Sequence, residues 1–329
     1  MIPEAKKAAV TQALQATFGV SEFEDISLLT IGLSSALIFR IVVLGKPYLL
    51  RIITRDDAMS NPAHWFDCMK MAAEAGLAPR VWYTGLTDRI SITDFITAKP
   101  FPVTKAAVLV PDLLKRVHAL PAFPYRVNYL DAVDGFIQKF QAAKILPENM
   151  ADELFNQYKR ITNVYPRNRD ELVSSHNDLK PENILFDGER AWLVDWEASF
   201  LNDRYADLAV VANFVVTSND EEKNYLKRYF GDEVSEYHYA RFFLMQQVFH
   251  MSYFTFFMLL CSAANVPIDV NLHKPGFSEF HNDIWAGKVD LADHNARQLY
   301  AWVHLEQLRH NLRLKRFDNS LRIVSDYEQ

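Results

Sequence analysis

The stretch His-Asn-Asp-Leu-Lys-Pro-Glu-Asn at residues 176–183 decides the fold of this chain, together with Val-Asp-Trp-Glu at residues 194–197. Apolar runs flank the two pieces, at residues 184–186 after the first and 191–194 up to the second. Because Asp-Gly at 187–188 separates these runs, the pattern predicts a strand, a tight turn and a second strand. Such a hairpin would bring the polar side chains of both pieces to one end of a small sheet.

Three of these polar side chains have the order and spacing that ATP-dependent kinases use. Asp178 near the start of the loop would accept a hydroxyl proton, while Asn183 and Asp195 would hold magnesium against ATP phosphates. A single Asp or Asn in a turn more often serves backbone hydrogen bonding than chemistry. The three together reverse that balance and predict a phosphoryl-transfer centre.

Length and composition are typical of a soluble enzyme. The 329 residues can form one large domain or two lobes with separate cores, and 50% hydrophobic residues argue against disorder. The formal charge of −6 argues against a nucleic-acid partner and permits a small cationic substrate. Cys68 and Cys261 are too few and too far apart for a disulfide framework or a zinc site. We therefore expect reduced thiols in a cytoplasmic protein.

One apolar segment is long enough to raise the question of a membrane span. Residues 1–19 read as an amphipathic helix with charged side chains, which does not resemble a secretory signal. Residues 242–267 contain no Asp, Glu, Lys or Arg and could cross a bilayer by length. They include Gln, His, Ser, Thr and Asn, which are poor lipid-facing residues. The pattern favours a buried helix without membrane insertion.

The rest of the chain divides into a strand-rich first part and a mostly helical second part. We expect helices at 1–20 and 61–75, strands at 26–30, 36–44, 48–53, 81–84 and 90–95, and a turn at 45–47. Residues 98–102 are the expected linker. From residue 108 onward the pattern is helical except for the hairpin at 172–195.

The 176–183 loop resembles the His-Arg-Asp-Leu-Lys-Pro-Glu-Asn loop of protein kinases, with Asn177 in place of the arginine. His-Asn-Asp followed by Asp-Trp-Glu is more similar to choline/ethanolamine kinases and the wider aminoglycoside phosphotransferase family. The resemblance implies an α+β, bilobal protein-kinase-like fold with a small β-rich N-lobe and a larger, mostly helical C-lobe. Residues 1–95 would form the N-terminal nucleotide-binding lobe, and residues 96–329 the C-terminal catalytic and substrate-binding lobe.

The same resemblance implies roles for single residues. Asp178 would be the catalytic base, and Lys180 would add positive charge at the transferring group. Asn183 and Asp195 would coordinate Mg²⁺. Arg51 stands where the family has a cation on the third strand, facing the α- and β-phosphates of ATP.

Weaker patterns imply further contacts with ATP. Residues 30–36 have the place of the phosphate-covering loop, where backbone amides and the hydroxyls of Ser34 and Ser35 would contact phosphate oxygens. The resemblance places the hinge, whose backbone would bind the adenine ring, at Thr93, Asp94 and Phe95.

The acidic partner of Arg51 stays open at this point. Choline kinases often carry arginine at this position, and the family pairs the cation with a glutamate on the N-lobe helix. Trp65 or nearby Asp67 falls at about the expected place, and Glu74 lies close to the helix end.

The spacing after Asp195 argues against a protein substrate. About a dozen residues separate it from Asp207, which is too short for the activation segment of a protein kinase, and no Ala-Pro-Glu follows. The resemblance implies that Asp207 braces the catalytic loop through hydrogen bonds at a helix start.

The acceptor is the least determined feature. Choline kinases carry a Trp-x-x-Trp pattern whose ring faces hold a quaternary ammonium, and the matching positions here are His250 and Tyr253. Glu197 would extend the metal shell or face the substrate. The glutamate that the family has shortly after Asp-Leu-Ala is missing, and aromatic segments of this kind more often serve core packing.

Three functions therefore stay open. The first is ATP- and Mg-dependent transfer of the γ-phosphate to choline, ethanolamine or a similar amino alcohol. The second is a kinase for another small hydroxyl compound, such as an aminoglycoside, a sugar or thiamine. The third is a nucleotide-binding regulator without catalysis. The sequence does not determine the acceptor, the choice between ATP and GTP, or the oligomeric state.

Overall fold

The computed structural model describes residues 2–29, 36–55, 61–99, 105–167, 171–286 and 288–327, and they form two compact units. Unit 1 comprises Met1–Pro102, Arg116–Tyr125 and His176–Leu201. Unit 2 comprises Val103–Lys115, Arg126–Ser175 and Asn202–Gln329. The 176–183 loop and the 194–197 segment thus belong to the same unit as the N-terminal strands. The predicted lobe boundary after residue 95 stays a prediction.

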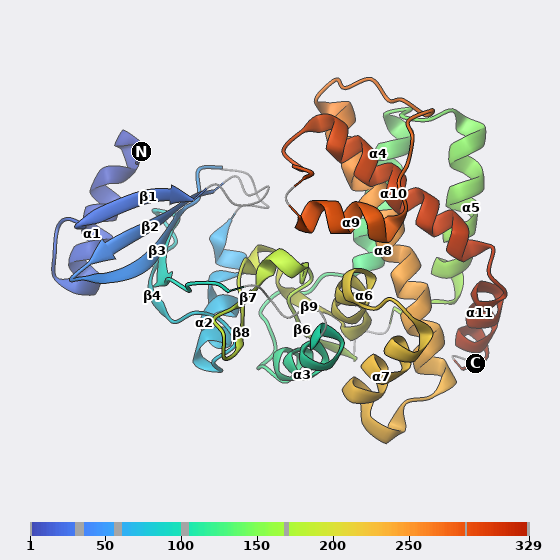
Figure 1. Ribbon diagram of the computed structural model, residues 1–329, viewed down its shortest axis with the longest axis horizontal. Coiled ribbons are helices and arrows are strands. Elements are labelled where there is room, and N and C mark those ends of the chain that lie inside the picture. Colours follow the sequence, from blue (N-terminus) through green and yellow to red (C-terminus); the bar gives the residue numbers. More distant parts are fainter. Residues whose placement is uncertain are drawn as a thin grey trace. The chain divides into compact units, whose positions relative to one another are not determined.

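Unit 1 is built on a five-stranded antiparallel sheet with the order β1-β2-β3-β5-β4 (Figure 1). The strands are β1 (Asp25–Leu29), β2 (Leu37–Val43), β3 (Lys46–Ile52), β4 (Val81–Gly85) and β5 (Ile90–Asp94). The predicted strands are confirmed with small shifts of their ends. In β2 the side chains of Phe39, Ile41 and Val43 are buried at a period of two, as expected for one covered face.

Helix α1 (Glu4–Phe18) covers that face of the sheet (Figure 1). Its buried side chains Val10, Ala13 and Leu14 recur at helical spacing and join the core of the sheet. The helix ends where Gly19 adopts a φ of 73° and donates its N–H to the carbonyl of Gln15 at 3.1 Å. The predicted N-terminal helix is confirmed.

The turn between β2 and β3 differs from the prediction. The register pairs Val43 with Lys46, so Leu44 and Gly45 form the turn, and Pro47 pairs with Val42 inside the strand. Leu44 and Gly45 have φ values of 50° and 72°, and positive φ at both positions matches the twist of a two-residue hairpin. The expected turn at 45–47 was wrong because it was placed on the proline rather than on the residues before it.

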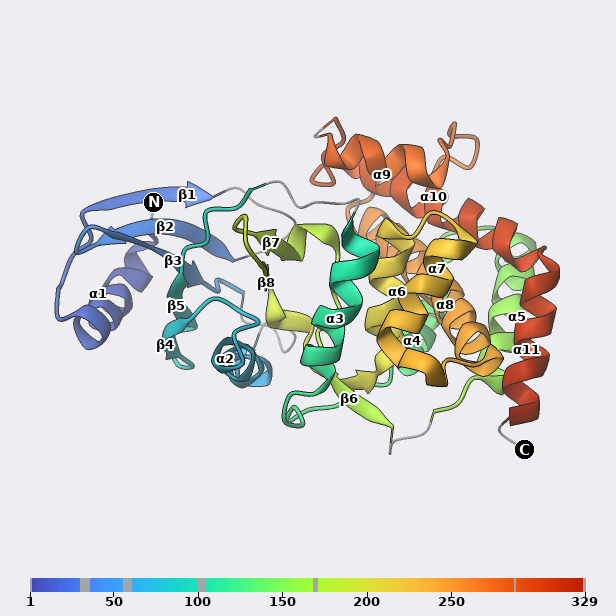
Figure 2. The same cartoon turned by 60° about the horizontal axis from the view of Figure 1, so that its bottom comes forward.

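Helix α2 (Phe66–Glu74) follows a short 3₁₀ turn at Pro62–His64 and runs beside β4 (Figure 2). The Asn61 side chain accepts a hydrogen bond from the N–H of Ala63 at 3.1 Å and so caps the start of the turn. Gly76 lies just past the helix end with a φ of 68°. The predicted helix at 61–75 is thereby confirmed, with a 3₁₀ start.

The predicted hairpin after the 176–183 loop is present. Strands β7 (Ile184–Phe186) and β8 (Ala191–Leu193) pair in antiparallel register. The turn between them is organised by Asp187, whose carboxylate accepts hydrogen bonds from Arg190 N–H at 2.9 Å, Trp192 Nε1 at 2.7 Å and Glu189 N–H at 2.8 Å. These donors lower the pKa of Asp187 to about 2, and its role is structural.

Unit 2 is mostly helical. Helix α3 (Ala106–His118) has residues in both units, and strands β6 (Leu172–Ser175) and β9 (Phe200–Asp203) flank the 176–198 region in the chain. The helices wholly in unit 2 are α4 (Tyr129–Ala142), α5 (Glu148–Val164), α6 (Arg204–Val215), α7 (Asn219–Phe230), α8 (Glu236–Ala263), α9 (Phe277–Trp285), α10 (His294–Leu312) and α11 (Lys315–Tyr327).

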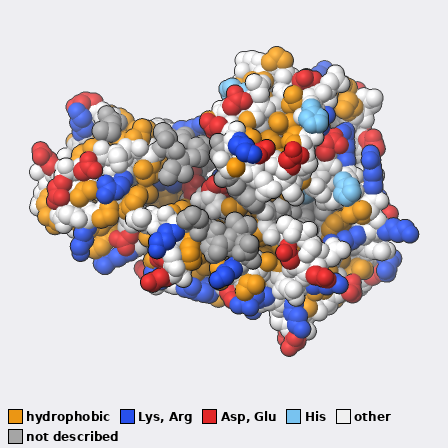
Figure 3. Space-filling view, in the orientation of Figure 1, with side chains coloured by type: hydrophobic (Ala, Val, Ile, Leu, Met, Phe, Trp, Pro, Cys, Tyr) orange, Lys and Arg blue, Asp and Glu red, His pale blue; other side chains and the backbone are white. Residues whose placement is uncertain are grey.

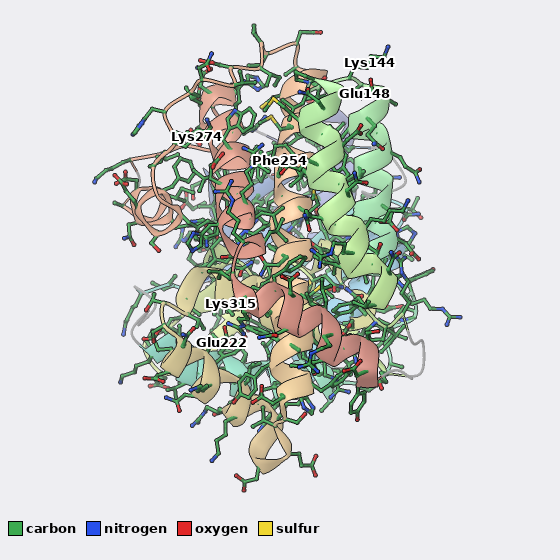
Figure 4. The ribbon with its side chains drawn as sticks, turned by 90° about the vertical axis from the view of Figure 1, so that its right-hand side faces the viewer. Lys144, Glu148, Glu222, Phe254, Lys274 and Lys315 are labelled. Carbon is green, nitrogen blue, oxygen red and sulfur yellow. The ribbon has the colours of Figure 1, made fainter. Side chains whose placement is uncertain are left out.

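Helix α8 is the central helix of unit 2. Phe254 on α8 lies between α4 and α10, with its ring centroid 5.4 Å from Phe140 and 6.1 Å from Trp302 (Figure 4). Glu222 on α7 forms an ion pair with Arg316 at the start of α11. Apolar contacts to α8 and this ion pair tie the helices of unit 2 together.

The long apolar segment predicted from the sequence belongs to α8. Among the described helices it is the one long and apolar enough to cross a membrane, and 72% of its most apolar window is buried inside the protein. Two of its polar side chains bond to helix carbonyls, because Gln247 donates to the carbonyl of Phe243 at 2.8 Å and Thr255 donates to that of Met251 at 2.9 Å. The expected buried helix is confirmed.

Two acids, Asp203 and Asp207, lie at the start of helix α6. Asp203 accepts the N–H of Tyr205 at 3.0 Å and forms an ion pair with Arg241 at 3.0 Å. Asp207 is fully buried within the first turn of the helix. The capping side chain is therefore Asp203, and the bracing role of Asp207 stays a prediction.

Charged side chains of both signs lie among one another over the described part of the face drawn in Figure 3. The formal net charge of the whole chain is −6. On this face the charges are therefore mixed rather than gathered into a basic stripe, the pattern that marks nucleic-acid-binding surfaces.

Candidate active site

Two side chains of the 176–183 loop bind it to the segment that follows β8. His176 Nε2 lies 3.0 Å from the carbonyl of Val194, and Asn177 Nδ2 donates to the carbonyl of Ala198 at 2.9 Å. Because a carbonyl can only accept, His176 carries a proton on Nε2. The His176 ring is fully buried, with its centroid 4.7 Å from that of Trp196. These two contacts hold the loop and the segment together.

The backbone of both pieces is left-handed at one residue. Asn177 has a φ of 65° and Asp195 has a φ of 66°. Such conformations cost a non-glycine residue about 1 kcal/mol or more, and Asn and Asp tolerate them best. Residues of this kind gather at functional sites, where the surrounding contacts hold them in place. Here the hydrogen bonds of His176 and Asn177 provide those contacts.

Three predicted site residues contact one another within the loop. Asn183 Nδ2 donates to the backbone carbonyl of Asp178 at 2.8 Å and to its carboxylate oxygen Oδ2 at 3.1 Å. Lys180 Nζ lies 3.3 Å from the same Oδ2. Because the amide nitrogen of Asn183 serves Asp178, its amide oxygen is the atom left to bind a further group.

Asp195 is linked to this group through the backbone and to the sheet through Arg51. The N–H of Val194 donates to the carbonyl of Asn183 at 3.0 Å, which fixes the residue before Asp195 beside the loop. Arg51 in β3 places its NH1 nitrogen 3.0 Å from Asp195 Oδ1 and its NH2 nitrogen against Glu197. Unit 1 thus brings together the predicted Asp178, Asn183, Asp195 and Arg51.

The partner of Arg51 that the sequence left open is identified by these contacts. Asp195 and Glu197 supply the carboxylates, and both come from the segment after β8. Trp65, at about the place expected for a helical acid, presents its ring, with the centroid 5.5 Å from the guanidinium carbon. Asp67 instead lies 3.2 Å from Lys70.

The pKa values of the Asp178 and Asp195 carboxyl groups are shifted in opposite directions. Burial raises the pKa of Asp178 to about 6, although Lys180 acts against it. Burial alone would also raise the pKa of Asp195, but the charges of Arg51 and Lys180 outweigh burial and lower it. Two carboxyl groups whose pKa values differ in this way provide one group that can take a proton near neutral pH and one that stays anionic.

The oxygens in this group fit a hard cation that is shared with phosphates. Mg²⁺ prefers carboxylate and amide oxygens and usually takes only one or two protein ligands beside phosphates and waters. An ionised Asp195 and the amide oxygen of Asn183 match that preference. Among the described residues, no group of three or more His, Cys, Asp or Glu could hold a metal by itself.

The predicted nucleotide contacts lie partly at the end of β5. Thr93 is buried, and the carboxylate of Asp94 accepts the indole N–H of Trp82 at 2.7 Å. The backbone N–H of Asp94 donates to the carbonyl of Arg80 at 2.9 Å. These atoms of Asp94 are engaged within unit 1, and the binding of an adenine ring by the backbone of residues 93–95 stays a prediction. The predicted phosphate contacts at residues 34 and 35 lie outside the described residues.

The predicted acceptor residues belong to a packed cluster in unit 2. His250 Nδ1 lies 3.0 Å from His304 Nδ1, so one ring donates and the other accepts. The Tyr253 ring centroid is 4.6 Å from that of His304 and 5.7 Å from that of Tyr300. His281 completes the group: its Nδ1 donates to a backbone carbonyl at 2.7 Å and its Nε2 accepts the Tyr300 hydroxyl at 3.1 Å. We call these five residues the histidine cluster.

Burial governs the charge of the histidine cluster. It lowers the pKa of His250 to about 3 and that of His281 to about 4, and it also lowers the pKa of His304. All three rings are therefore neutral at pH 7. The sequence predicted only two members of the cluster, because α9 and α10 contribute the others without a motif of their own.

A comparison with known families identifies the chain. Residues 25–243, more than half of the sequence, match the phosphotransferase enzyme family, APH. The chain belongs to this family. A relative of known sequence, the protein LicA of Haemophilus influenzae, is 36% identical over 71 residues, which are 22% of this chain and 26% of LicA. The match thus spans about a quarter of that relative.

Solved structures share the fold over almost the whole chain. A choline/ethanolamine kinase family protein from Mesorhizobium loti has a TM-score of 0.70 at 20% identity, covering 98% of this chain and 99% of that one. The choline kinase LicA from Streptococcus pneumoniae has a TM-score of 0.58 at 16% identity, covering 86% and 98%. The spectinomycin phosphotransferase APH(9)-Ia has a TM-score of 0.56 at 12% identity, covering 91% of this chain and 98% of that one. The predicted α+β, protein-kinase-like fold class is confirmed.

Proposed function

We propose that this member of the phosphotransferase family transfers the γ-phosphate of ATP, with Mg²⁺, to the hydroxyl of choline, ethanolamine or a similar amino alcohol in the cytoplasm. One observation carries the proposal. Asp178 and Asp195 occupy one compact unit beside Asn183, and their pKa values are shifted in opposite directions. Two pKa values shifted apart in this way are not required of residues that only stabilise a turn, whereas a catalytic base and a metal ligand require them.

The base would be Asp178. With a pKa of about 6 it is mostly ionised at pH 7 and still basic enough to take the hydroxyl proton as the bond to phosphorus forms. Lys180 lies 3.3 Å from its carboxylate and adds positive charge beside the transferring group. Asn183 orients Asp178 through two hydrogen bonds, which fixes the base before the acceptor arrives.

The phosphates would be held by charge from two sides. Asp195 and Asn183 would hold Mg²⁺, which offsets the negative charge of the phosphate oxygens when bound. Arg51 supplies a guanidinium that is kept charged, because the carboxylates of Asp195 and Glu197 outweigh its burial and raise its pKa. The loop with Ser34 and Ser35 would cover the phosphates, and the hinge at 93–95 would hold the adenine ring.

The acceptor class rests on the sequence forms His-Asn-Asp and Asp-Trp-Glu and on the kinases that this chain is similar to. Proteins named as choline or ethanolamine kinases occur among them, such as the LicA of S. pneumoniae. Tyr253 is partly exposed, whereas His250 is buried against His304, so Tyr253 offers the ring face that could bind a cationic group.

The decisive experiment is a coupled ADP-release assay with Mg-ATP. Choline, ethanolamine, thiamine, kanamycin and a panel of sugars serve as acceptors, and GTP replaces ATP in a parallel series. Turnover with choline or ethanolamine at the highest kcat/KM supports the proposal. Turnover with kanamycin, thiamine or a sugar alone would make the chain a kinase for another small hydroxyl compound. Binding of Mg-ATP without turnover on any acceptor would favour a regulator.

A further inference from the structure

Arg51 divides its two terminal nitrogens between two carboxylates. NH1 contacts Asp195 Oδ1 at 3.0 Å, and NH2 contacts Glu197. The guanidinium carbon lies 5.5 Å from the ring centroid of Trp65, which limits where the planar group can move. The Arg51 side chain is 10% exposed and that of Glu197 is 38% exposed, so a desolvated cation meets a partly solvated acid.

The carboxylate of Asp195 has two competing partners under the proposed function. Magnesium would bind the same kind of oxygen that Arg51 now contacts. If Asp195 were the only acid at hand, metal binding would leave a buried guanidinium without a carboxylate, which is strongly unfavourable. Glu197 removes that conflict, because Arg51 keeps a charge-assisted hydrogen bond while Asp195 turns to the metal.

We infer that Glu197 is a positioning residue: it holds Arg51 against Trp65 for phosphate binding and leaves Asp195 to the metal. The inference rests on the proposed phosphotransfer. It gives Glu197 a role other than the metal-shell or acceptor contact expected from the sequence. The two acids of Asp-Trp-Glu then have different partners: Asp195 would bind Mg²⁺, and Glu197 binds the guanidinium of Arg51.

The loss of Glu197 has a specific consequence. Both nitrogens of Arg51 would turn to Asp195, and a bidentate guanidinium–carboxylate pair competes better with a metal than a single contact does. Glu197→Gln should therefore raise the Mg²⁺ concentration for half-maximal turnover and the KM for ATP by about tenfold. The kcat at saturating Mg²⁺ should change less. A purely structural role would lower the unfolding temperature and leave the Mg²⁺ dependence in place.

The test is a double-mutant cycle with Arg51→Met, Glu197→Gln and the combined variant. Turnover is measured against Mg²⁺ concentration, and calorimetry measures the binding of Mg²⁺ with a non-hydrolysable ATP analogue. In the Arg51→Met background, Glu197→Gln should have little further effect on either quantity, because the residue it positions is gone. Arg51→Gln, which also removes the cation but keeps a polar side chain, replaces Arg51→Met if the latter fails to fold.

Glu189→Gln is the matched control. Glu189 is an exposed acid of the same unit, in the turn between β7 and β8, and its removal changes the net charge equally. Its Mg²⁺ dependence should equal that of the wild type. A shift as large as that of Glu197→Gln would show a general charge effect and overturn the inference.

The remaining outcomes separate the inference from the proposed function. An active wild type in which Glu197→Gln and Arg51→Met act additively refutes the positioning role and leaves the phosphotransfer standing. A wild type that releases no ADP with any acceptor refutes the proposed function. The calorimetric measurements then test the inference without turnover, because Glu197→Gln must still weaken the binding of Mg²⁺ with the nucleotide analogue through Arg51.

Discussion

The 176–198 region of unit 1 and the histidine cluster of unit 2 both bury ionisable side chains, with opposite results. In the first region, positive charges accompany the carboxylates, so Asp195 stays ionised although burial disfavours its charge. In the second, burial dominates, and the pKa values of all three histidines fall. A buried group keeps its charge only where an opposite charge accompanies it, and otherwise it adopts its neutral form. The first region therefore keeps charged groups that can take part in ionic chemistry, whereas the second is a neutral, packed part of the interior of unit 2.

The largest effect should come from Asp178→Asn, which removes the proposed base from the charged region. We expect kcat to fall by about 10³-fold or more, because proton transfer by a positioned base contributes about that much. Binding of Mg-ATP should stay nearly intact. Single-turnover kinetics and calorimetry measure the two quantities separately. Near-normal turnover by this variant would show that Asp178 is not the base.

The same substitution should stabilise the fold. The folded-state pKa of Asp178 is raised to about 6, so the folded state favours the protonated carboxyl. The contribution of Asp178 to stability is then highest below its unfolded pKa and is lost as pH rises through 6. Because asparagine is neutral at every pH, the free energy of unfolding at pH 7 should rise by about 1–3 kcal/mol. Urea unfolding at pH 7 measures this, and a destabilised variant would contradict the raised pKa.

The histidine cluster should make the protein sensitive to acid. The folded pKa values of its histidines lie below the unfolded value of about 6.5, so their contribution to stability is complete above pH 6.5 and is lost as pH falls toward 4. The loss at pH 5 should be about 2 kcal/mol for each buried histidine. Urea unfolding between pH 7.5 and 5 measures the slope. His304→Phe should flatten it, whereas alanine at the exposed His273 should not.

The pH dependence of turnover should separate the two regions. Protonation of Asp178 removes the base, so kcat/KM should fall about tenfold for each pH unit below 6. His304→Phe removes only part of the stability loss that comes from the histidine cluster. The variant should leave the acid limb of the kcat/KM profile at the same pH. A limb that moves with His304→Phe would mean that acid inactivation reports unfolding of unit 2 rather than titration of the base.

The smallest effect concerns the acceptor. If Tyr253 offers a ring face to a cationic group, Tyr253→Leu should raise the KM for choline or ethanolamine by about threefold to thirtyfold, with the KM for ATP unchanged. Tyr253→Phe keeps the ring and serves as the control. Equal KM values for the wild type and the leucine variant would place the acceptor away from the histidine cluster.

Local chemistry made the 176–198 region predictable. The hairpin follows from two apolar runs and Asp187-Gly188, and the loop follows from polar residues at a fixed spacing. The turn at Leu44-Gly45 was misplaced because the proline two residues later carries a stronger local signal than the register does. At the start of α6 the sequence motif singled out Asp207, and only the structure showed that the nearby Asp203 caps the helix, since spacing alone cannot tell which of two nearby acids does so.

The sequence by itself determined the phosphotransferase family and predicted the residues proposed for the site, because the motif is short and consists of nearly consecutive side chains. The tertiary structure alone decided which charges meet. Arg51 pairs with acids 144 and 146 residues away, and His250 meets a ring 54 residues away. The physical reason is that a pKa, and with it the role of a buried group, depends on burial and on the nearest charge, and folding sets both.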